Sequence, residues 1–404
     1  AKIPLVAYTG LEYQLSAIQN NRAIFVLWAI TGKLDAPGAI YLNAKGLETP
    51  KLFEIPEDNK PIGVDEFPLF YKFSGLGQFS RFPKAVLEDD PYPVRGLMIL
   101  GGSPALSFPD SKSWREAYKK LDCLIVLDRY YTEDARYADV FFPACSLFEV
   151  PKAVSGPEGP HIVEPLITPV GESKNDVLIM GAIAEKLGFG DKLPQTEEEL
   201  REWLLSGTAP YAGDFGGGSG KKQERHYKKY ETGELRADGK PGFPTPSGKL
   251  EICSTILEEN GFVPYPEYKD IRSIPELAGE EYTFTMTSGA RSNNRMGVFG
   301  ANLDGITAIE PYPLVDICAE DAKEIGIEDG DMVKVTTPFA NGTFKAKIRG
   351  IARHAIHIPH GGGSAYMSEP WKHGNVNDLC SLDYADPMTG FVLIKSMPCK
   401  VEKE

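Results

Sequence analysis

The chain has 404 residues, of which 42% are hydrophobic and 25% are charged, and its formal net charge is −14. This length allows two or three domains with a buried core, and the composition is that of an ordinary globular protein. The acidic balance argues against a nucleic-acid or anionic-membrane surface, and no stretch approaches the roughly 20 apolar residues of a membrane span. The first residues lack the pattern of a signal peptide, so a cytoplasmic location is expected, or a periplasmic one if an export signal lies outside this chain.

The predicted elements begin with a helix over 12–34, where apolar residues recur at helical spacing and Gly32 provides the stop. From residue 97 strands and helices alternate. Strands are predicted over 97–102, 123–128 and 139–144, and helices over 110–121, 132–138, 174–190 and 196–207. Strand–helix–strand at this pitch predicts a parallel sheet with right-handed crossovers.

The second half of the chain has a different character. Residues 206–248 are flexible in composition and highly charged, which predicts a connector or a surface lid, and 243–252 predicts a rigid turn leading into a strand. Strands are predicted over 282–289, 331–338, 342–350 and 354–361, and a helix over 319–326 with Gly326 past its end. The expected fold class is α/β: a segment over 1–95 that completes an α/β domain, a parallel-sheet Rossmann-like domain over 96–205, a connector over 206–275 and a closed β-barrel over 276–404.

Polar residues follow two of the predicted parallel strands. Gly101, Gly102, Ser103 and Pro104 end the first, where backbone N–H groups can approach a phosphate or sugar, although most such turns bind nothing. Asp128 ends the second strand at the same edge, and a carboxylate there suits the N–H pair of a guanine or a ribose diol. Thr132 either lies beside that ligand or caps the helix that follows, and the two interpretations are compatible.

The barrel half offers further candidates. The stretch after the strand at 282–289 holds a dense set of donors suited to phosphates or a polar heterocycle, and the alternative is a surface loop. Three histidines occur over 354–360, but side chains alternate along a strand, so a three-histidine metal site is not expected. Asn375 and Asn377 could pair with a heterocycle or form an Asn-rich turn. The candidates from this half are Ser288, Gly289, Arg291, Asn293, Asn294, His360, Gly361, Asn375 and Asn377.

Neither a metal-binding motif nor a catalytic one can be recognised. The six cysteines are scattered without a C-x-x-C pair, so no zinc or iron–sulfur site is predicted on this chain, and reduced, mostly buried thiols are expected. Nucleophile-elbow, H-E-x-x-H and Walker motifs are also absent from the sequence. His360 and Arg291 could line a substrate funnel, but a role in ligand packing is expected for both, and the catalytic residues stay unknown.

In this order, these stretches resemble the C-terminal portion of the molybdopterin oxidoreductase family, also called the dimethyl sulfoxide reductase family. The segments TPSGKLEI and CAEDAKEIGIEDGDMVKV are typical of it. One family motif is matched by Asp128, Thr132, Ala135, Ala138, Asp139, Val140, Pro143, Ala144 and Glu149. The closing motif is matched by Asn377, Leu379, Asp386, Pro387, Gly390, Lys395, Cys399 and Val401. Within the family, the thiosulfate and polysulfide reductase or acetylene hydratase-like branches are the most similar.

The resemblance implies a Rossmann-like domain and a double-psi β-barrel that bind bis-molybdopterin guanine dinucleotide with molybdenum or tungsten. Asp128 and Thr132 would contact the guanosine end, and Asp139 and Lys395 join the implied site with the barrel residues. The family's cysteine-rich [4Fe-4S] motif and its metal-ligating residue belong N-terminal to anything in this sequence. The chain therefore resembles the second half of such an enzyme. An N-terminal half or cysteine-rich partner subunit, an Fe–S electron-transfer protein and a small-molecule substrate are the expected partners.

The implied function is two-electron redox or oxygen-atom transfer at the metal, with electrons relayed through the cluster on the other half. The alternatives are a non-catalytic pterin-binding subunit and a non-redox hydratase of the same family. A histidine often found near the barrel entrance has no counterpart in the stretch VFGANLD, which leaves the substrate class open.

Overall fold

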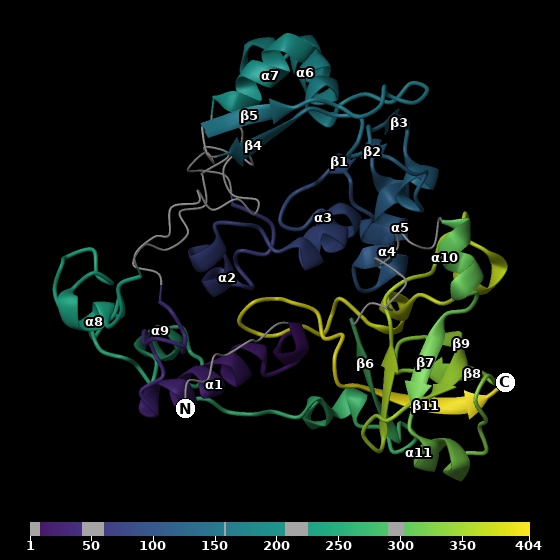
Figure 1. The fold of residues 1–404 in the computed structure, drawn as a ribbon. Coiled ribbons are helices and arrows are strands. Elements are labelled where there is room, and N and C mark those ends of the chain that lie inside the picture. The colour runs from purple at the N-terminus through teal and green to yellow at the C-terminus, as the bar shows by residue number, and fades with distance from the viewer. Residues whose placement is uncertain (1–8, 43–59, 157–158, 207–224, 290–302) are drawn as a thin grey trace.

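A computed structural model of the chain describes residues 9–42, 60–156, 159–206, 225–289 and 303–404. In Figure 1 a parallel sheet with its helices lies above a closed β-barrel. This confirms the expected mixed α/β class with a parallel sheet followed by a barrel, while the double-psi connectivity and the domain boundaries stay predictions. Arg291, Asn293 and Asn294 lie outside the described residues, as do 207–224 of the predicted lid.

The sheet contains β1 (Gly96–Leu100), β2 (Cys123–Asp128) and β3 (Val140–Pro143), in that order and parallel throughout. The strands β2 and β3 lie within their predicted ranges, and β1 begins one residue before the predicted range of 97–102. Leu100 pairs with Leu127, and Asp128 with Pro143, so the carboxyl ends of the strands share one edge. The apolar run of β2 suits a strand that is covered on both faces, and its Leu124 and Val126 are fully buried.

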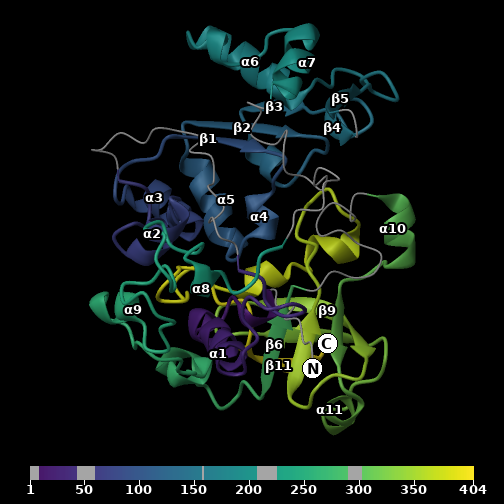
Figure 2. The same ribbon diagram turned by 60° about the vertical axis from the view of Figure 1, so that its left-hand side comes forward.

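Helices cover both sides of this sheet. Figure 2 shows α4 (Pro104–Ser107) and α5 (Ser111–Lys120) on the side of the barrel, and α6 (Asp176–Lys186) and α7 (Glu197–Leu205) on the far side. The helix starts follow from the sequence: Asp110 caps α5, and Thr196 with Glu199 forms a capping box on α7. The predicted helix over 132–138 is a 3-10 turn, Asp134–Tyr137.

An antiparallel hairpin between β3 and α6 was not predicted. It consists of β4 (Lys152–Gly156) and β5 (Gly159–Val163), and α7 packs against it. The sequence hides these strands because prolines and glycines interrupt the alternation of apolar residues that normally signals a strand.

The N-terminal residues and the connector pack together beside the two domains. The helices here are α1 (Ala17–Ile30), α2 (Pro68–Ser74), α8 (Lys229–Thr232) and α9 (Thr255–Glu259). The helix α3 (Phe82–Glu88) packs against α5 of the sheet domain, where Phe82 stacks on Trp114. The described part of the predicted lid is anchored: Lys229 Nζ lies 2.5 Å from Asp35 Oδ1, and the two side chains are 1% and 0% exposed. The strand predicted at the end of 243–252 is wrong, because that segment is a turn in which Phe243 N donates to Gly248 O at 2.9 Å.

The barrel closes in the order β10-β6-β11-β8-β9-β7. Its strands are β6 (Phe284–Ser288), β7 (Leu314–Ile317), β8 (Met332–Thr336), β9 (Asn341–Ile348), β10 (Ala355–Ile358) and β11 (Met397–Lys403). The two accompanying helices are α10 (Asp304–Ile309) and α11 (Ala319–Glu324). Inward-facing residues such as Met286, Phe344 and Ile356 are fully buried. Since β6 and β10 are parallel, their carboxyl ends also meet.

Hydrogen bonds between side chains and backbone groups join the barrel to the sheet domain. Asn377 Nδ2 donates to Leu106 O at the end of α4 (2.7 Å), and Arg115 Nη2 of α5 donates to Gly363 O (3.1 Å). Glu133, which is buried, accepts from Ala365 N at 3.1 Å. The loop after β10 is therefore fastened to α4, α5 and the turn after β2. Among the described helices, none is both long and apolar enough to cross a membrane.

Candidate functional site

The turn after β1 and the end of β2 meet at the carboxyl edge of the sheet. Gly101 N donates to Leu127 O at 2.9 Å, which places the Gly101–Pro104 turn beside Asp128. Gly101 has a φ of +58°, and an added Cβ would meet no atom within 4 Å, so it is the backbone conformation that favours glycine. Asp128 Oδ1 accepts from Tyr130 N at 3.1 Å, and burial raises the pKa of this carboxyl. Two polar elements that are distant in sequence thus lie side by side, as predicted.

Asp134 holds this turn in place from behind. Its Oδ1 accepts from Ala105 N (3.0 Å) and from the Tyr118 hydroxyl (2.7 Å), and its Oδ2 accepts from the Ser103 hydroxyl. The carboxyl group is fully buried, and burial raises its pKa although these donors oppose the shift. Sequence reasoning did not select Asp134, because its three donors come from two distant segments. It positions the turn, and the Ser103 hydroxyl faces this carboxylate.

Two other residues predicted for this edge have local roles. Thr132 Oγ1 accepts from Ala135 N at 3.3 Å, which is the capping interaction considered for it, and this does not exclude a neighbouring ligand. Asp139 lies before β3, at the amino end of the strands, and its Oδ2 accepts from Leu124 N at 2.7 Å. Asp139 is therefore at the opposite edge of the sheet from Asp128, and the structure does not bring it to the predicted site.

The second cluster of predicted residues lies where β6 and β10 end in the barrel. Lys395 Nζ donates to Ser288 O, and the Ser288 hydroxyl donates to Ile394 O at 3.1 Å. Gly289 has a φ of +107°, and a Cβ on it would lie 2.9 Å from Lys395 Nζ and 3.5 Å from His360 Nε2. Ser288, Gly289, His360 and Lys395 therefore converge. Lys395 is buried, and burial lowers the pKa of its ammonium group.

Replacing Lys395 with methionine is expected to change how stability depends on pH. A lysine pKa lowered on folding means that the unfolded chain binds the proton more tightly, so the charged ammonium destabilises the fold at low pH. This cost is relieved as pH rises from the lowered folded pKa towards the ordinary value of 10.5. Lys395→Met should flatten the rise, by roughly 1.4 kcal/mol for each unit of the shift.

The measurement is the free energy of unfolding in urea at several pH values that approach the ordinary lysine pKa of 10.5 from below. Lys400→Met is the matched control, because this lysine, whose side chain is 42% exposed, lies on β11 a few residues away. Equal slopes for the wild type and Lys395→Met would contradict the assigned burial of a charged ammonium.

The remaining barrel residues form contacts within the protein. Asn375 Nδ2 donates to Leu106 O (3.2 Å) and to the Ser111 hydroxyl (3.0 Å), and both Asn375 and Asn377 are buried. A Cβ at Gly361 would lie 3.2 Å from a ring carbon of Trp371, so it is the protein's own ring that approaches this glycine. Of the side-chain polar atoms of Asn375 and Asn377, Asn377 Oδ1 is buried without a hydrogen-bond partner. Asn375 and Asn377 join the sheet domain to the barrel.

The histidines and cysteines do not gather. His354 Nδ1 lies 3.9 Å from Asp321 Oδ1, His357 Nδ1 lies 3.2 Å from Asp316 Oδ2, and His360 lies beside Gly289. Within the described ranges, no three His, Cys, Asp or Glu side chains are grouped to hold a metal ion. Cys318, Cys380 and Cys399 are buried as expected, Cys145 is half-buried, and Cys123 and Cys253 are exposed.

Sequence comparisons give two family matches that together cover both domains. The family described as "Molybdopterin oxidoreductase" matches residues 19–186, and the one described as "Molydopterin dinucleotide binding domain" matches residues 286–398. Each polar cluster lies in one of these matched regions.

Curated relatives and a solved structure agree with these matches. The "Probable oxidoreductase YoaE" of Bacillus subtilis is 31% identical over 332 residues, covering 78% of this chain and 44% of the relative. The acetylene hydratase of Syntrophotalea acetylenica is 24% identical over 403 residues, covering 89% and 53%. The solved acetylene hydratase from Pelobacter acetylenicus matches the fold with a TM-score of 0.70 at 21% identity, over 86% of this chain and 53% of that one. The chain spans about half the length of the curated relatives it matches.

Proposed function

Because the chain belongs to the molybdopterin oxidoreductase family, we propose that it is the cofactor-binding half of a molybdenum or tungsten enzyme that holds two molybdopterin guanine dinucleotides. The observation that carries this proposal is the pair of polar clusters. One lies at the carboxyl edge of the parallel sheet, and the other at the parallel strand ends of the barrel. A dinucleotide cofactor has two polar ends, and each needs fixed partners before it can be buried.

The residues present suit such a group. At the sheet edge, Asp128 would accept from the N–H groups of a guanine, and the backbone of Gly101 and Gly102 would approach phosphate or sugar oxygens. In the barrel, the buried Lys395 ammonium would face an anionic part of the cofactor, with His360 and the Gly289 backbone beside it. When bound, the metal of this cofactor supplies two-electron redox or oxygen-atom transfer. The residues of this chain bind and orient the cofactor. We also propose that the strands of the barrel have double-psi connectivity.

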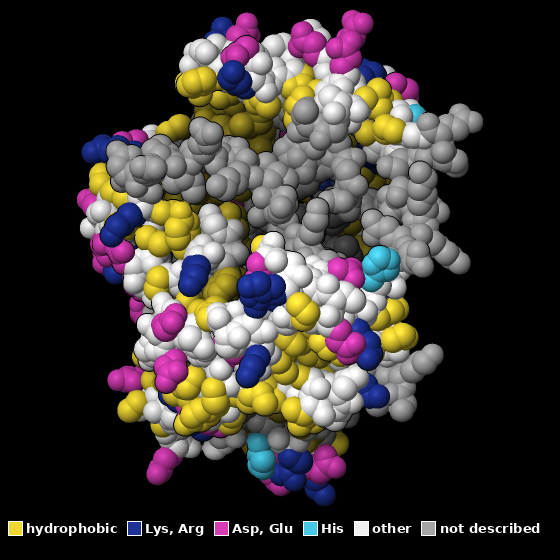
Figure 3. All heavy atoms as spheres, turned by 90° about the vertical axis from the view of Figure 1, so that its left-hand side faces the viewer, with side chains coloured by type: hydrophobic (Ala, Val, Ile, Leu, Met, Phe, Trp, Pro, Cys, Tyr) yellow, Lys and Arg dark blue, Asp and Glu magenta, His cyan; other side chains and the backbone are white. Residues whose placement is uncertain are grey.

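The other parts of the enzyme belong to the proposal as well. We place the [4Fe-4S] cluster and the residue that ligates the metal on the portion of the relatives' length that this chain does not span. Exposed apolar side chains support a covering partner: Phe25, Leu27 and Ile30 of α1 are 45–66% exposed. Figure 3 shows hydrophobic side chains gathered on the face that includes α1. Exposed apolar patches of this kind commonly mark interaction sites. A cytoplasmic location stays a prediction.

Two alternatives remain in the proposal. Acetylene hydratase, a relative of this chain, favours a non-redox reaction as the second candidate. A pterin-binding subunit without chemistry of its own is the third. All three require the same cofactor site, so the first experiment addresses the site itself.

Denaturing the natively purified protein should release a pterin that carries guanosine monophosphate, identified by liquid chromatography and mass spectrometry. Asp128→Ala should lower the amount of released pterin by roughly 10-fold, because hydrogen bonds to a charged carboxylate contribute about 1.5–3 kcal/mol. The control is Asp122→Ala, which removes an exposed carboxylate directly before β2. This variant should release as much pterin as the wild type. A wild-type protein that releases no pterin would overturn the proposal.

A further inference from the structure

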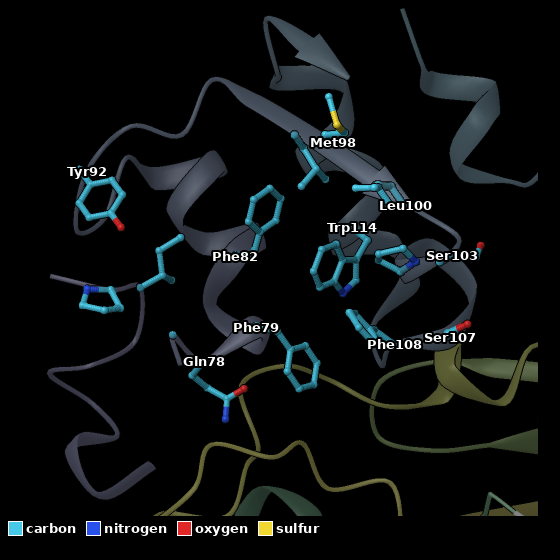
Figure 4. A pocket seen from close by; sticks show the side chains of 17 residues that line it. Gln78, Phe79, Phe82, Tyr92, Met98, Leu100, Ser103, Ser107, Phe108 and Trp114 are labelled. Atoms are coloured by element: carbon cyan, nitrogen blue, oxygen red, sulfur yellow. The ribbon is translucent and has the colours of Figure 1, made fainter. Parts of the chain in front are cut away.

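Two of the cavities in the described part of the chain differ in character. The cavity beside β1 is lined by aromatic rings, and Figure 4 shows those of Phe79, Phe82, Phe108 and Trp114. The second cavity, of about 580 Å³, lies between the sheet domain and the barrel and is formed by α5, the turn after β2, the start of β9 and the loop after β10. The charged residues on its wall are Arg115, Glu133, Arg136, Lys372 and Asp378. A polar cavity between two domains is a common place for a small charged ligand.

This second cavity is separate from both polar clusters of the proposed cofactor site. Its lining contains no residue of the Gly101–Pro104 turn, and Asp128 does not reach it either. The barrel cluster of Ser288, Gly289, His360 and Lys395 also lies outside the lining. The cavity therefore needs an explanation of its own.

The Arg115 guanidinium lies between two carboxylates without a hydrogen bond to either. Glu133 Oε1 is 3.5 Å from its Nε, and Asp378 Oδ1 is 3.7 Å from its Nη1. Charge-assisted hydrogen bonds between such groups are about 2.7–2.9 Å long. Within the described residues, Arg115 Nε and Asp378 Oδ1 are both buried and have no hydrogen-bond partner. A donor and an acceptor are therefore left unpaired at one wall of the cavity.

These two atoms call for a ligand that carries both kinds of charge. Buried donors and acceptors are normally satisfied, because leaving them unpaired costs free energy. Arg115 Nε requires an oxygen, whereas Asp378 Oδ1 requires an N–H group. Single waters can pair with each atom, but the cavity is far larger than two waters need. A simple anion would satisfy Arg115 and at the same time bring its charge next to the Asp378 carboxylate.

The more exposed part of the lining adds positive charge. The side chains of Arg136 and Lys372 are 40% and 30% exposed, and His373 is exposed as well. Arg136 Nη1 donates to Glu133 Oε1 at 2.8 Å. With the histidine neutral, three cationic side chains and two carboxylates line the cavity, which leaves an excess of one positive charge. A ligand with a net charge of about −1 would balance this lining.

We propose that this cavity binds an acidic α-amino acid. Its ammonium group would donate to Asp378 Oδ1, and one of its carboxylates would accept from Arg115 Nε. The second carboxylate would face Arg136 and Lys372 at the more exposed side. Each charge of the ligand then has a partner of opposite sign, which a dicarboxylate or a neutral amino acid does not achieve. This site goes beyond the proposed function, since none of its contacts involves the cofactor.

The site lies on the contacts that join the two domains. Arg115 Nη2 donates to Gly363 O at 3.1 Å, and Glu133 Oε2 accepts from Ala365 N at 3.1 Å. Both carbonyl and amide belong to the loop after β10, which also carries His360 of the barrel cluster. A bound amino acid would connect α5 and the turn after β2 to this loop. Its binding would therefore stabilise the junction between the domains.

The proposal is tested by isothermal titration of the natively purified protein with L-glutamate at low ionic strength. We expect a dissociation constant of about 1 mM or lower. Glutarate lacks the ammonium group, and L-glutamine lacks the second carboxylate. Each should bind at least roughly 10-fold more weakly than L-glutamate, because each leaves a charged group of the cavity without its partner.

Three variants separate the assigned contacts from a general loss of structure. Asp378→Asn removes only the charge that pairs with the ammonium group, so L-glutamate should bind roughly 10-fold more weakly while glutarate affinity does not fall. Lys372→Met should weaken both ligands, because both carry the carboxylate assigned to it. Lys119→Met is the matched control, since this lysine lies on α5 with Arg115 but pairs with Glu116 outside the cavity. It should bind L-glutamate as the wild type does.

The contrary results are equally specific. A wild-type protein that binds no L-glutamate at about 10 mM would overturn the proposal. Equal affinities for L-glutamate and glutarate would identify a plain anion site and overturn the ammonium contact. An equal loss of both ligands in Asp378→Asn would contradict that contact too. None of these measurements depends on pterin or on a second polypeptide, so each leaves the proposed function intact.

Discussion

Replacing Asp134 with alanine should cost about 3 kcal/mol of the free energy of unfolding and loosen the turn at the end of β1. The substitution leaves three buried donors without an acceptor: the Ser103 hydroxyl, the Ala105 amide and the Tyr118 hydroxyl. Each buried donor that loses its partner costs about 1–3 kcal/mol, and relief from burying the carboxyl group offsets part of the sum. Equilibrium unfolding in urea measures the change.

Two controls make this expectation specific. Asp122→Ala removes an exposed carboxylate paired with Arg95, and it should change stability by less than about 0.5 kcal/mol. Asp134→Asn keeps one acceptor oxygen and should cost less than Asp134→Ala. A cost for Asp134→Ala no larger than that of Asp122→Ala would mean that this carboxylate does not hold the turn.

Replacing Lys229 with methionine should destabilise the protein by about 3–5 kcal/mol, because it leaves the buried Asp35 carboxylate without its cation. Lys229 Nζ also donates to His226 O at 2.7 Å and lies 3.9 Å from the centre of the Tyr41 ring. Removing the lysine therefore undoes the attachment of the connector to the N-terminal residues. Urea unfolding is again the measurement, and limited proteolysis should show earlier cleavage within 225–248.

The neighbouring lysine provides the matched control. Lys228 pairs with Glu231 at 3.0 Å, but both side chains are more than half exposed, so Lys228→Met should cost at most about 1 kcal/mol. Combining Lys229→Met with Asp35→Asn should recover part of the loss, since no buried charge then stays unpaired. Equal costs at positions 228 and 229 would contradict the anchoring role of the buried pair.

Much of the fold could be predicted because its signals are local. The apolar run over 123–128 is β2 to the residue, and Asp110 and Thr196 cap α5 and α7. Parallel pairing follows from the strand–helix–strand pitch. It then follows that Gly101 and Asp128 share an edge, because parallel strands end on the same side.

The remaining roles depend on tertiary contacts that no local pattern encodes. The role of Asp134 depends on donors from two other segments of the chain. The role of Asn375 depends on Leu106, which is 269 positions away. The connector looked mobile because its charges are dense, yet one of its lysines finds a buried carboxylate near the N-terminus. Asp139 matched a motif of the family, but its carboxylate is used at the amino end of β2.

Whether this chain is half of a molybdenum or tungsten enzyme is tested by elemental analysis of the natively purified protein for molybdenum, tungsten and iron, with the intact mass of every co-purifying polypeptide. We expect about one molybdenum or tungsten per complex, together with iron and a cysteine-rich polypeptide that supplies the other half of the relatives' length. A folded protein that contains neither metal and no further polypeptide would contradict it, and this chain would then not be half of a molybdenum or tungsten enzyme.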